Sequence, residues 1–571
     1  MRSKTGRPQV FRLLALGSLL AISGAQVCPL QSPSKSCVAG TFNALLSSYG
    51  ASIERIGVVP TSTGCFGESN TVNQGYGAYN YALGVGGSCV VLVKRDTYRF
   101  GLILPNNSTW KGSLLTSGGY SFSGGINWWD MGPGVSIYGM ATMSTDTGHN
   151  STGDDMSWAR GNVHAQEDWG WRAVEGSVDL AKKMVNTYYG KFGRKLSYSY
   201  YSGCSTGGRQ GLKQIQMAQT SFNGALIGAP AWEQYGLMPW IAKVGTDYAA
   251  SGSNGSISEG PGGQWEGIIT QVNLACDTKD GLKDSIISRP DLCRFEDIAG
   301  DYLQCGGQFA LPEPQCLSAY QISVMSNFYK DYTVGNDLIY RPPGLGSESD
   351  LSSVILLLAN AGNWDRQWAK QFLSAADDYA ADDVAVKARQ VNPGNATADR
   401  FDISQFKQSN GKIIMYQGLA DGVIAHPGTT KYFESTRAAM GGNVDSFFRY
   451  FQVPGMRHCA GSDVAVDSSG NSSYIAPWMM GGMAQYTAAI NSGLEAQARQ
   501  LLGKPETDAF TALQKWVETP GAAGPASIIA TTWFTGNHSV WRQRPLCPYP
   551  QRANLKTGQN PDVASSWTCS S

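Results

Sequence analysis

The chain has 571 residues, and its 44 basic and 44 acidic side chains give a formal net charge of zero. This balance offers no electrostatic basis for binding nucleic acid or an anionic membrane. The length allows one large enzyme domain with an insertion or about two to four ordinary domains. A charged fraction of only 15%, with 69 glycines and 16 tryptophans, is typical of a loop-rich secreted enzyme.

Residues 1–25 have the three parts of a signal peptide. A basic start leads into the apolar run 13–22, and the small residues Ser23 and Ala25 precede a cleavage site before Gln26. The apolar run is too short for a membrane anchor, which needs about 20 residues. The sequence therefore predicts a secreted, extracellular protein with no membrane attachment.

The twelve cysteines of an exported chain are expected to form six disulfides. A zinc site is the alternative, but the chain has no paired C-x-x-C spacing. Cysteines that are close in sequence are predicted to pair, the four N-terminal ones are predicted to pair among themselves in an order that stays open, and Cys204 and Cys459 remain by elimination. The close pairs are Cys276 with Cys293, Cys305 with Cys316, and Cys547 with Cys569, and the N-terminal four are Cys28, Cys37, Cys65 and Cys89.

Several acceptor sequences for N-glycosylation also fit an exported glycoprotein. In such a chain some of them are expected to carry glycans and to lie on the surface. They are at Asn106, Asn107, Asn150, Asn254, Asn395, Asn471 and Asn537.

Strand-like and helix-like segments alternate before residue 230. Such alternation predicts a mostly parallel sheet with helices on both faces. Strands are predicted at 89–93, 98–104, 196–201 and 224–229, further apolar segments lie at 110–125 and 135–143, and helices are predicted at 176–189 and 208–220.

The pattern changes after about residue 232. Residues 232–405 contain irregular glycine-rich stretches, two local cysteine pairs and several tryptophans, and strand-like runs return at 412–416 and 446–453. The simplest interpretation is an inserted lid domain, 232–405, between two halves of one α/β domain, 26–231 and 406–571.

The string Gly203-Cys204-Ser205-Thr206-Gly207 fits the nucleophile-elbow pattern G-x-S-x-G. In this motif a serine lies on a sharp turn between a strand and a helix. The strand predicted at 196–201 leads into it and the helix predicted at 208–220 follows. The motif alone arises easily by chance in a glycine-rich chain, so its context matters.

A serine nucleophile needs a base within hydrogen-bond reach and a carboxylate that orients the base. In hydrolases with this type of sheet the order is serine, acid, histidine, and both partners lie in loops after strands. Asp421 and His458 satisfy that order, and Cys459 beside His458 supports the choice. The other histidines are less suitable, because His149 and His164 precede the elbow, His426 is too close to Asp421, and His538 has no clear strand before it.

An oxyanion hole needs two backbone N–H donors aimed at the developing charge. Thr206, the residue after the nucleophile, is predicted to supply one. Gly119, in the run Gly118-Gly119-Tyr120, is the candidate for the other. An ordinary tight turn is the alternative interpretation of this glycine pair.

An acidic loop predicts a second kind of site. Asp277, Asp280 and Asp284 place three carboxylates within eight residues, a density that suits calcium. The spacing is not that of an EF-hand. A solvated acidic turn is the alternative.

The elbow with its cysteine, Asp421 and the pair His458-Cys459 resemble the tannase and feruloyl esterase family of fungi and bacteria. The resemblance extends over roughly residues 28–571 and includes residues 110–112, 144–149 and 277–286. It implies an α/β-hydrolase core with a lid and a disulfide between Cys204 and Cys459. It also implies structural calcium in the lid, held by side chains of Asp277, Asp280 and Asp284 and by carbonyls of Leu282 and Ile286, and no organic cofactor.

The resemblance further implies a serine esterase acting on phenolic acid esters. Ser205, Asp421 and His458 would be the triad, and hydroxycinnamate esters (ferulate and p-coumarate) of plant cell-wall polysaccharides the substrates. A tannase releasing gallate is the alternative, and a non-catalytic hydrolase-fold binding protein is a third hypothesis. A homodimer is left open.

Overall fold

The protein is described by a computed structural model. It describes residues 28, 30–31, 34, 36–69, 80–217, 220–360, 364–376, 379–463, 479–534 and 537–571. The predicted signal peptide, 1–25, and Asn471 lie outside the described residues.

A nine-stranded mixed sheet forms the centre of the molecule, in the order β1-β4-β5-β7-β6-β8-β9-β12-β13. The strands from β7 to β13 are parallel to one another, whereas β1, β4 and β5 pair antiparallel. The antiparallel part was not predicted; it arises because β4 and β5 are joined by a tight turn, which only antiparallel neighbours allow. The strands are β1 (Ala51–Val58), β4 (Cys89–Arg95), β5 (Tyr98–Leu104), β6 (Ser113–Ser117), β7 (Ala141–Thr145), β8 (Tyr198–Cys204), β9 (Gly224–Gly228), β12 (Lys412–Gly418) and β13 (Phe448–Val453).

Helices cover both faces of this sheet, as predicted, and alternate residues of a strand face different layers. In β12, Ile413 and Met415 pack with one helical layer, and Ile414 and Tyr416 pack with the other. The first layer contains α4 (Ala173–Gly190), α5 (Thr206–Met217) and α15 (His426–Ala439), and the second contains α16 (Met483–Asn491) and α18 (Ala509–Glu518). Near the other end of the sheet, α1 (Asn43–Ser48) joins the first layer, and α2 (Trp128–Ser136) packs on the opposite face of β4 and β5.

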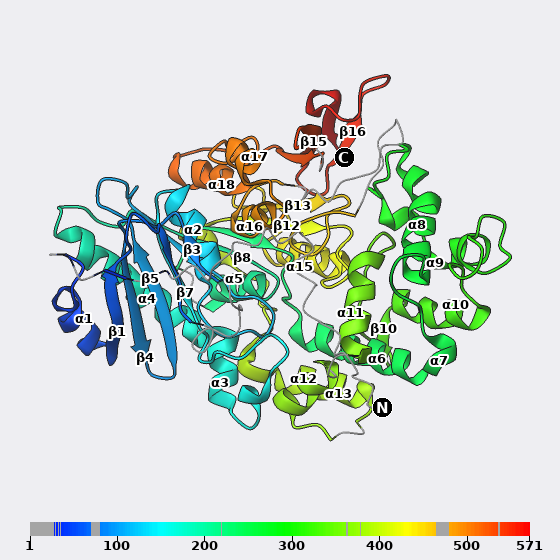
Figure 1. Cartoon of the computed structure of the whole chain (residues 1–571), viewed down its shortest axis with the longest axis horizontal. Helices are drawn as coiled ribbons and strands as arrows, with labels where there is room; N and C mark the ends of the chain where they lie inside the picture. The colour runs from blue at the N-terminus through cyan, green and yellow to red at the C-terminus, as the bar shows by residue number, and fades with distance from the viewer. Residues whose placement is uncertain are drawn as a thin grey trace, which may run out of the picture.

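A mainly helical cap lies between β9 and β12 and has its own buried core. Figure 1 shows it in green on the right, beside the sheet that runs from blue β1 to yellow β13. The individual helices of this cap were not predicted from the sequence. Helix α6 contains Gly236, Pro239 and Gly245 and is buried on most sides, so its sequence lacks an amphipathic pattern. The cap elements are α6 (Gln234–Ala250), α7 (Gly252–Gly255), α8 (Gln264–Cys276), α9 (Phe295–Ile298), α10 (Ala319–Ser326), β10 (Tyr332–Val334), β11 (Asp337–Tyr340), α11 (Glu348–Asn360), α12 (Trp364–Leu373) and α13 (Ala381–Val391).

Short elements complete the chain. The C-terminal part, orange to red at the top of Figure 1, includes α18 of the second helical layer and ends in two hairpins. The remaining elements are β2 (Cys65–Phe66), β3 (Ala82–Leu83), α3 (Val163–Glu167), α14 (Ser404–Gln408), α17 (Glu495–Leu501), β14 (Ile528–Trp533), β15 (Val540–Leu546), β16 (Arg552–Leu555) and β17 (Trp567–Ser570).

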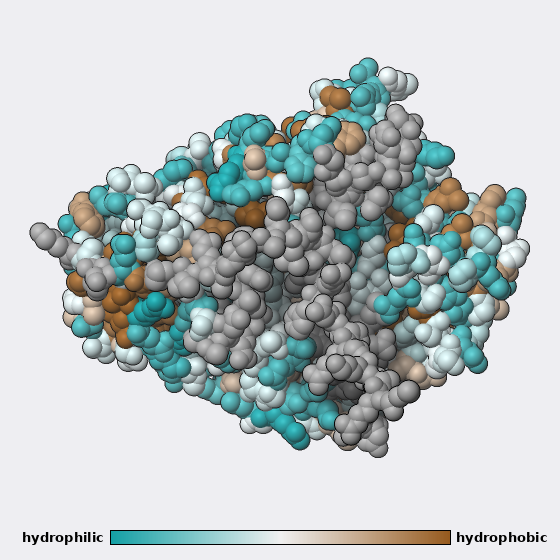
Figure 2. Space-filling view, in the orientation of Figure 1, coloured by the Kyte–Doolittle hydropathy of each residue, from teal (hydrophilic) through white to brown (hydrophobic). Residues whose placement is uncertain are grey.

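The surface is mostly hydrophilic where it can be seen. In the view of Figure 2, hydrophobic residues form separate groups, one of them over the β1 and β4 end of the sheet. Within the described ranges, every helix is too short or too polar to cross a membrane. The predicted glycosylation sites in these ranges are accessible: Asn106, Asn150, Asn254, Asn395 and Asn537 are exposed and Asn107 is half-buried.

Candidate active site

Ser205 lies on the turn between β8 and α5. Its φ of +62° is in the left-handed region, which a non-glycine residue rarely adopts. The backbone N–H of Ser205 donates to Gly228 O (3.1 Å), and its carbonyl accepts from Arg209 N (3.0 Å). These bonds hold the strained turn that the elbow motif requires.

The two glycines of the motif permit the close approach of neighbouring backbone. A Cβ added to Gly203 would lie 2.8 Å from the carbonyl group of Gly207, and one added to Gly207 would lie 2.7 Å from Gly119 O. Real side chains do not fit at such distances. The motif therefore packs α5 against β8, and the loop of Gly119 against the elbow.

Asp421 and His458 are brought together from loops that follow β12 and β13. His458 Nδ1 lies 2.8 Å from Asp421 Oδ2, and the Asp421 side chain is fully buried. Asp421 Oδ1 accepts from the N–H groups of Val423 (2.9 Å) and Ile424 (2.7 Å), and Gln417 Nε2 donates to Oδ2 (2.9 Å). With Nδ1–H donating to Asp421, Nε2 is left as the basic nitrogen. No local pattern in the sequence pointed to Gln417.

A disulfide joins the two halves of the site. Cys204, just before Ser205, is bonded to Cys459, just after His458, with the two Cα atoms 5.9 Å apart. In the described residues the Ser205 hydroxyl makes no direct hydrogen bond to His458. Such bonds are often long before substrate binds. The bridge nonetheless keeps the serine and the imidazole close across 255 residues of chain.

The surroundings of His458 favour its charged form. Burial opposes the charge, but the Asp421 carboxylate, by charge and hydrogen bond, and the Asp350 charge outweigh burial and raise the pKa of His458. Burial instead lowers the pKa of His426 to about 4 and that of His149 to about 3. Of these three histidines, only His458 has a carboxylate partner suited to a general base.

The predicted oxyanion donors lie at the elbow but differ in their present bonding. Thr206 is the first residue of α5, where backbone N–H groups have no partner within the helix. The N–H of Gly119 donates to Gln210 Oε1 (2.9 Å). Gly119 would have to release Gln210 before it could bind an oxyanion.

The predicted calcium ligands do not gather around one point. Among the described residues, no three Asp, Glu, His or Cys side chains form a group that could hold a metal ion. Asp277 Oδ1 faces the N–H groups of Asp284 and Ile286 (both 3.2 Å), and Asp284 Oδ2 lies 2.5 Å from Arg544 Nη2. Ca²⁺ takes six to eight oxygen ligands, and calcium binding by this loop stays a prediction.

The structure pairs all twelve cysteines. The N-terminal four pair among themselves, and the close pairs are joined as their spacing suggested. The bonds besides Cys204–Cys459 are Cys28–Cys65, Cys37–Cys89, Cys276–Cys293, Cys305–Cys316 and Cys547–Cys569.

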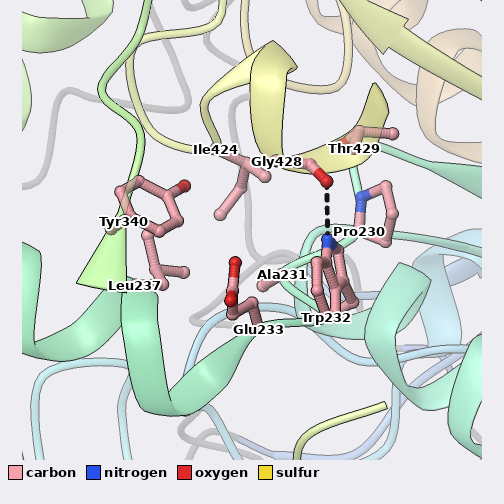
Figure 3. Close-up of a pocket in the computed structure, with 9 residues that line it drawn as sticks. All are labelled: Pro230, Ala231, Trp232, Glu233, Leu237, Tyr340, Ile424, Gly428 and Thr429. Atoms are coloured by element: carbon pink, nitrogen blue, oxygen red, sulfur yellow. Dashed lines mark hydrogen bonds between the residues drawn. The ribbon is translucent and has the colours of Figure 1, made fainter. Parts of the chain in front are cut away.

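A small pocket lies behind the elbow, between the cap and the loop of Asp421. Figure 3 shows Tyr340 and Leu237 on the cap side, Ile424 across from Tyr340, and the carboxylate of Glu233 below Ile424. Its volume of about 10 Å³ admits one water molecule at most. The pocket is therefore too small for a substrate.

The sheet, the elbow and the Asp421–His458 pair define a serine hydrolase of the α/β-hydrolase fold. The chain belongs to the tannase and feruloyl esterase family, whose model matches residues 85–382 and 373–570. It is a carboxylic ester hydrolase of that family.

Individual relatives agree with this family. A protein named "Probable feruloyl esterase B-2" from Aspergillus terreus is 30% identical over 81% of this chain and 82% of its own. The crystal structure of an esterase from Aspergillus oryzae is 25% identical, with a TM-score of 0.77 over 93% of this chain and 100% of its own. That of feruloyl esterase B from Aspergillus oryzae is 23% identical, with a TM-score of 0.73 over 93% and 99%, and shows the fold alone.

Proposed function

We propose that this protein is a secreted esterase that releases ferulate and p-coumarate from plant cell-wall polysaccharides. One observation carries the chemistry. The disulfide Cys204–Cys459 links the strained turn of Ser205 to the loop of His458, and His458 pairs with buried Asp421. The hydroxycinnamate preference rests on the names of relatives about 30% identical, such as that from Aspergillus terreus. Extracellular location is supported by the disulfides, which persist in oxidising compartments.

The proposed reaction passes through an acyl-enzyme. Ser205 Oγ attacks the ester carbonyl carbon while His458 Nε2 takes the hydroxyl proton, and Asp421 stabilises the resulting imidazolium. The N–H of Thr206 donates to the oxyanion. The C–O bond to the alcohol breaks as His458 returns the proton, and a water activated by His458 then releases the aromatic acid.

The test is hydrolysis of methyl ferulate, methyl p-coumarate and propyl gallate side by side. We expect cleavage of both cinnamates with little release of gallate, and a loss on the order of 10⁶-fold in Ser205→Ala with the fold retained. Preference for the gallate ester would show that the protein is a tannase. A Ser205→Ala protein with full activity would refute the catalytic assignment.

Structural calcium is a separate proposal. It is supported by the closeness of negative charges in this loop: burial raises the pKa values of Asp277 and Asp280, and the nearby Asp284 charge adds to the rise. Thermal unfolding in excess calcium and in EDTA is the test. We expect a higher Tm with calcium, by mass action, and no such difference in Asp277→Asn. Equal Tm values for the wild type would contradict calcium binding.

A further inference from the structure

The cap touches both catalytic loops through the N-terminal end of α11. A Cβ added to Gly422, next to Asp421, would lie 2.4 Å from Leu351 N and 2.6 Å from Ser347 O. Only glycine fits there. The start of α11 is therefore packed directly on the loop that carries the acid.

The same helix end binds the loop that carries the base. Asp350 Oδ2 accepts the backbone N–H of His458 (2.7 Å), and Oδ1 accepts from Arg457 Nε (2.8 Å). The Asp350 side chain is only 7% exposed. Charge-assisted bonds of this kind are short and directional, so one carboxylate oxygen holds the backbone N–H of His458 and the other holds the guanidinium of Arg457.

A second cap contact reaches the acid loop from another element. The hydroxyl of Tyr340, at the end of β11, accepts the N–H of Ala425 (3.2 Å). Figure 3 shows the Tyr340 ring on the cap side of the pocket, across from Ile424. Ile424 in turn donates its N–H to Asp421. The cap is thus bonded to both loops whose relative position sets the Asp421–His458 distance.

We propose that Asp350 is a positioning residue that fixes the backbone of His458 and makes the cap part of the catalytic apparatus. This inference rests on the proposed serine esterase mechanism. A histidine whose peptide is anchored holds its imidazole in register with Asp421, and small displacements of catalytic groups are costly to rate.

Asp350 also contributes charge to the environment of His458. The charged groups in the described segments around His458 are Asp421, Asp350, Glu348, Arg457 and Asp463. Arg457 lies 3.6 Å from Asp463. Burial acts to lower the pKa of His458, but the charges of Asp421 and Asp350 outweigh burial and raise it. Removing the Asp350 charge should therefore lower the pH at which the base becomes protonated.

The first variant is Asp350→Asn, which keeps the size of the side chain and removes its charge. We expect kcat to fall on the order of 10-fold or more, KM to change little, and the acid limb of the kcat profile to move down by at least about half a pH unit. The matched control is Asp247→Asn, a cap aspartate that pairs with Lys243 within α6. It should leave rate and profile unchanged.

A second variant keeps the proposal testable if Asp350→Asn folds poorly. Arg457→Met retains the Asp350 carboxylate but removes its counter-charge, so the acid limb should move in the opposite direction. An unchanged limb in Asp350→Asn, or limbs that move the same way in both variants, would overturn the proposal.

Labelling of Ser205 by a fluorophosphonate separates this inference from the substrate assignment. The labelling rate depends on the base and not on ester specificity. A wild type that labels but cleaves no phenolic ester would refute the substrate, while a slower, pH-shifted labelling of Asp350→Asn would still support positioning. A wild type that neither labels nor hydrolyses would overturn both.

Discussion

Two loops of this protein each bury an aspartate beside a disulfide, but they balance the buried charge differently. In the catalytic loop, Asp421 is bound by neutral donors and by His458. In the cap loop, Asp284 lies against the guanidinium of Arg544, and both side chains are less than a tenth exposed. A permanent cation neutralises the structural aspartate. Neutral donors leave the catalytic aspartate's charge for an imidazolium that exists only during reaction.

The largest expected effect comes from making the catalytic aspartate neutral. Asp421→Asn should lower kcat on the order of 10⁴-fold, because the amide cannot orient or stabilise a charged His458. The side chain keeps its size, so Tm should change little. Steady-state kinetics and thermal unfolding are the measurements, and a variant with a tenth of wild-type kcat would show that Asp421 is not the acid.

Removing the Arg544 guanidinium, which neutralises Asp284 in the cap loop, should lower stability and leave catalysis unchanged. Arg544→Met leaves Asp284 buried without its counter-charge, and we expect the free energy of unfolding to fall by about 3–5 kcal/mol. The activity of folded protein should be unaffected. Denaturant titration tests this, and adding Asp284→Asn to Arg544→Met should restore most of the loss. Equal stability of Arg544→Met and wild type would show that the pair is not important.

The disulfides near the two loops, Cys204–Cys459 and Cys276–Cys293, should also differ in their effect on activity. Replacing Cys204 and Cys459 by alanine should cost about 2–4 kcal/mol of stability and also reduce kcat on the order of 10- to 100-fold, since the serine and base lose their tether. Replacing Cys276 and Cys293, which are 17 positions apart and flank the loop of Asp277, should cost stability alone. If both double variants lost the same share of kcat, the first bridge would have no special positioning role.

The smallest expected effect is a pH dependence of activity, which arises because, against burial, the Asp421 charge raises the pKa of His458. His458 must be neutral to accept a proton, and its pKa is raised above 6.5. Activity should therefore fall as pH drops through a midpoint above 6.5. The profile of kcat/KM tests this, and a midpoint below 6.5 would mean that burial dominates over the carboxylates.

The catalytic residues could be predicted because their signals are local. Ser205 lies in a five-residue motif, and Asp421 and His458 follow recognisable strands in the required order. Asp350 and Gln210 had no such signal: Asp350 is 108 residues from His458, and Gln210 is 91 residues from Gly119. Contacts of this kind are created by tertiary packing, which periodicity does not encode.

The sheet and the cap differ in the same way. Strands such as β5 were found because they are short, apolar and bounded by turns. Strand β1 was missed because it is an edge strand with several exposed positions. Helix α6 of the cap was missed because a helix buried on most sides needs no polar face. The carboxylate spacing in residues 277–284 predicts a calcium site, which stays a prediction. Spacing could not show that Arg544, from a distant hairpin, reaches Asp284.

The adjacency of β9 and β12 has a consequence for synthesis. These neighbours are separated in sequence by the whole cap, since β9 ends at Gly228 and β12 begins at Lys412. While the ribosome makes the intervening residues, β9 is an open edge with its hydrogen-bonding groups unpaired. Exposed edges of this kind promote aggregation. Efficient production in a heterologous host should therefore depend on chaperone protection during that interval.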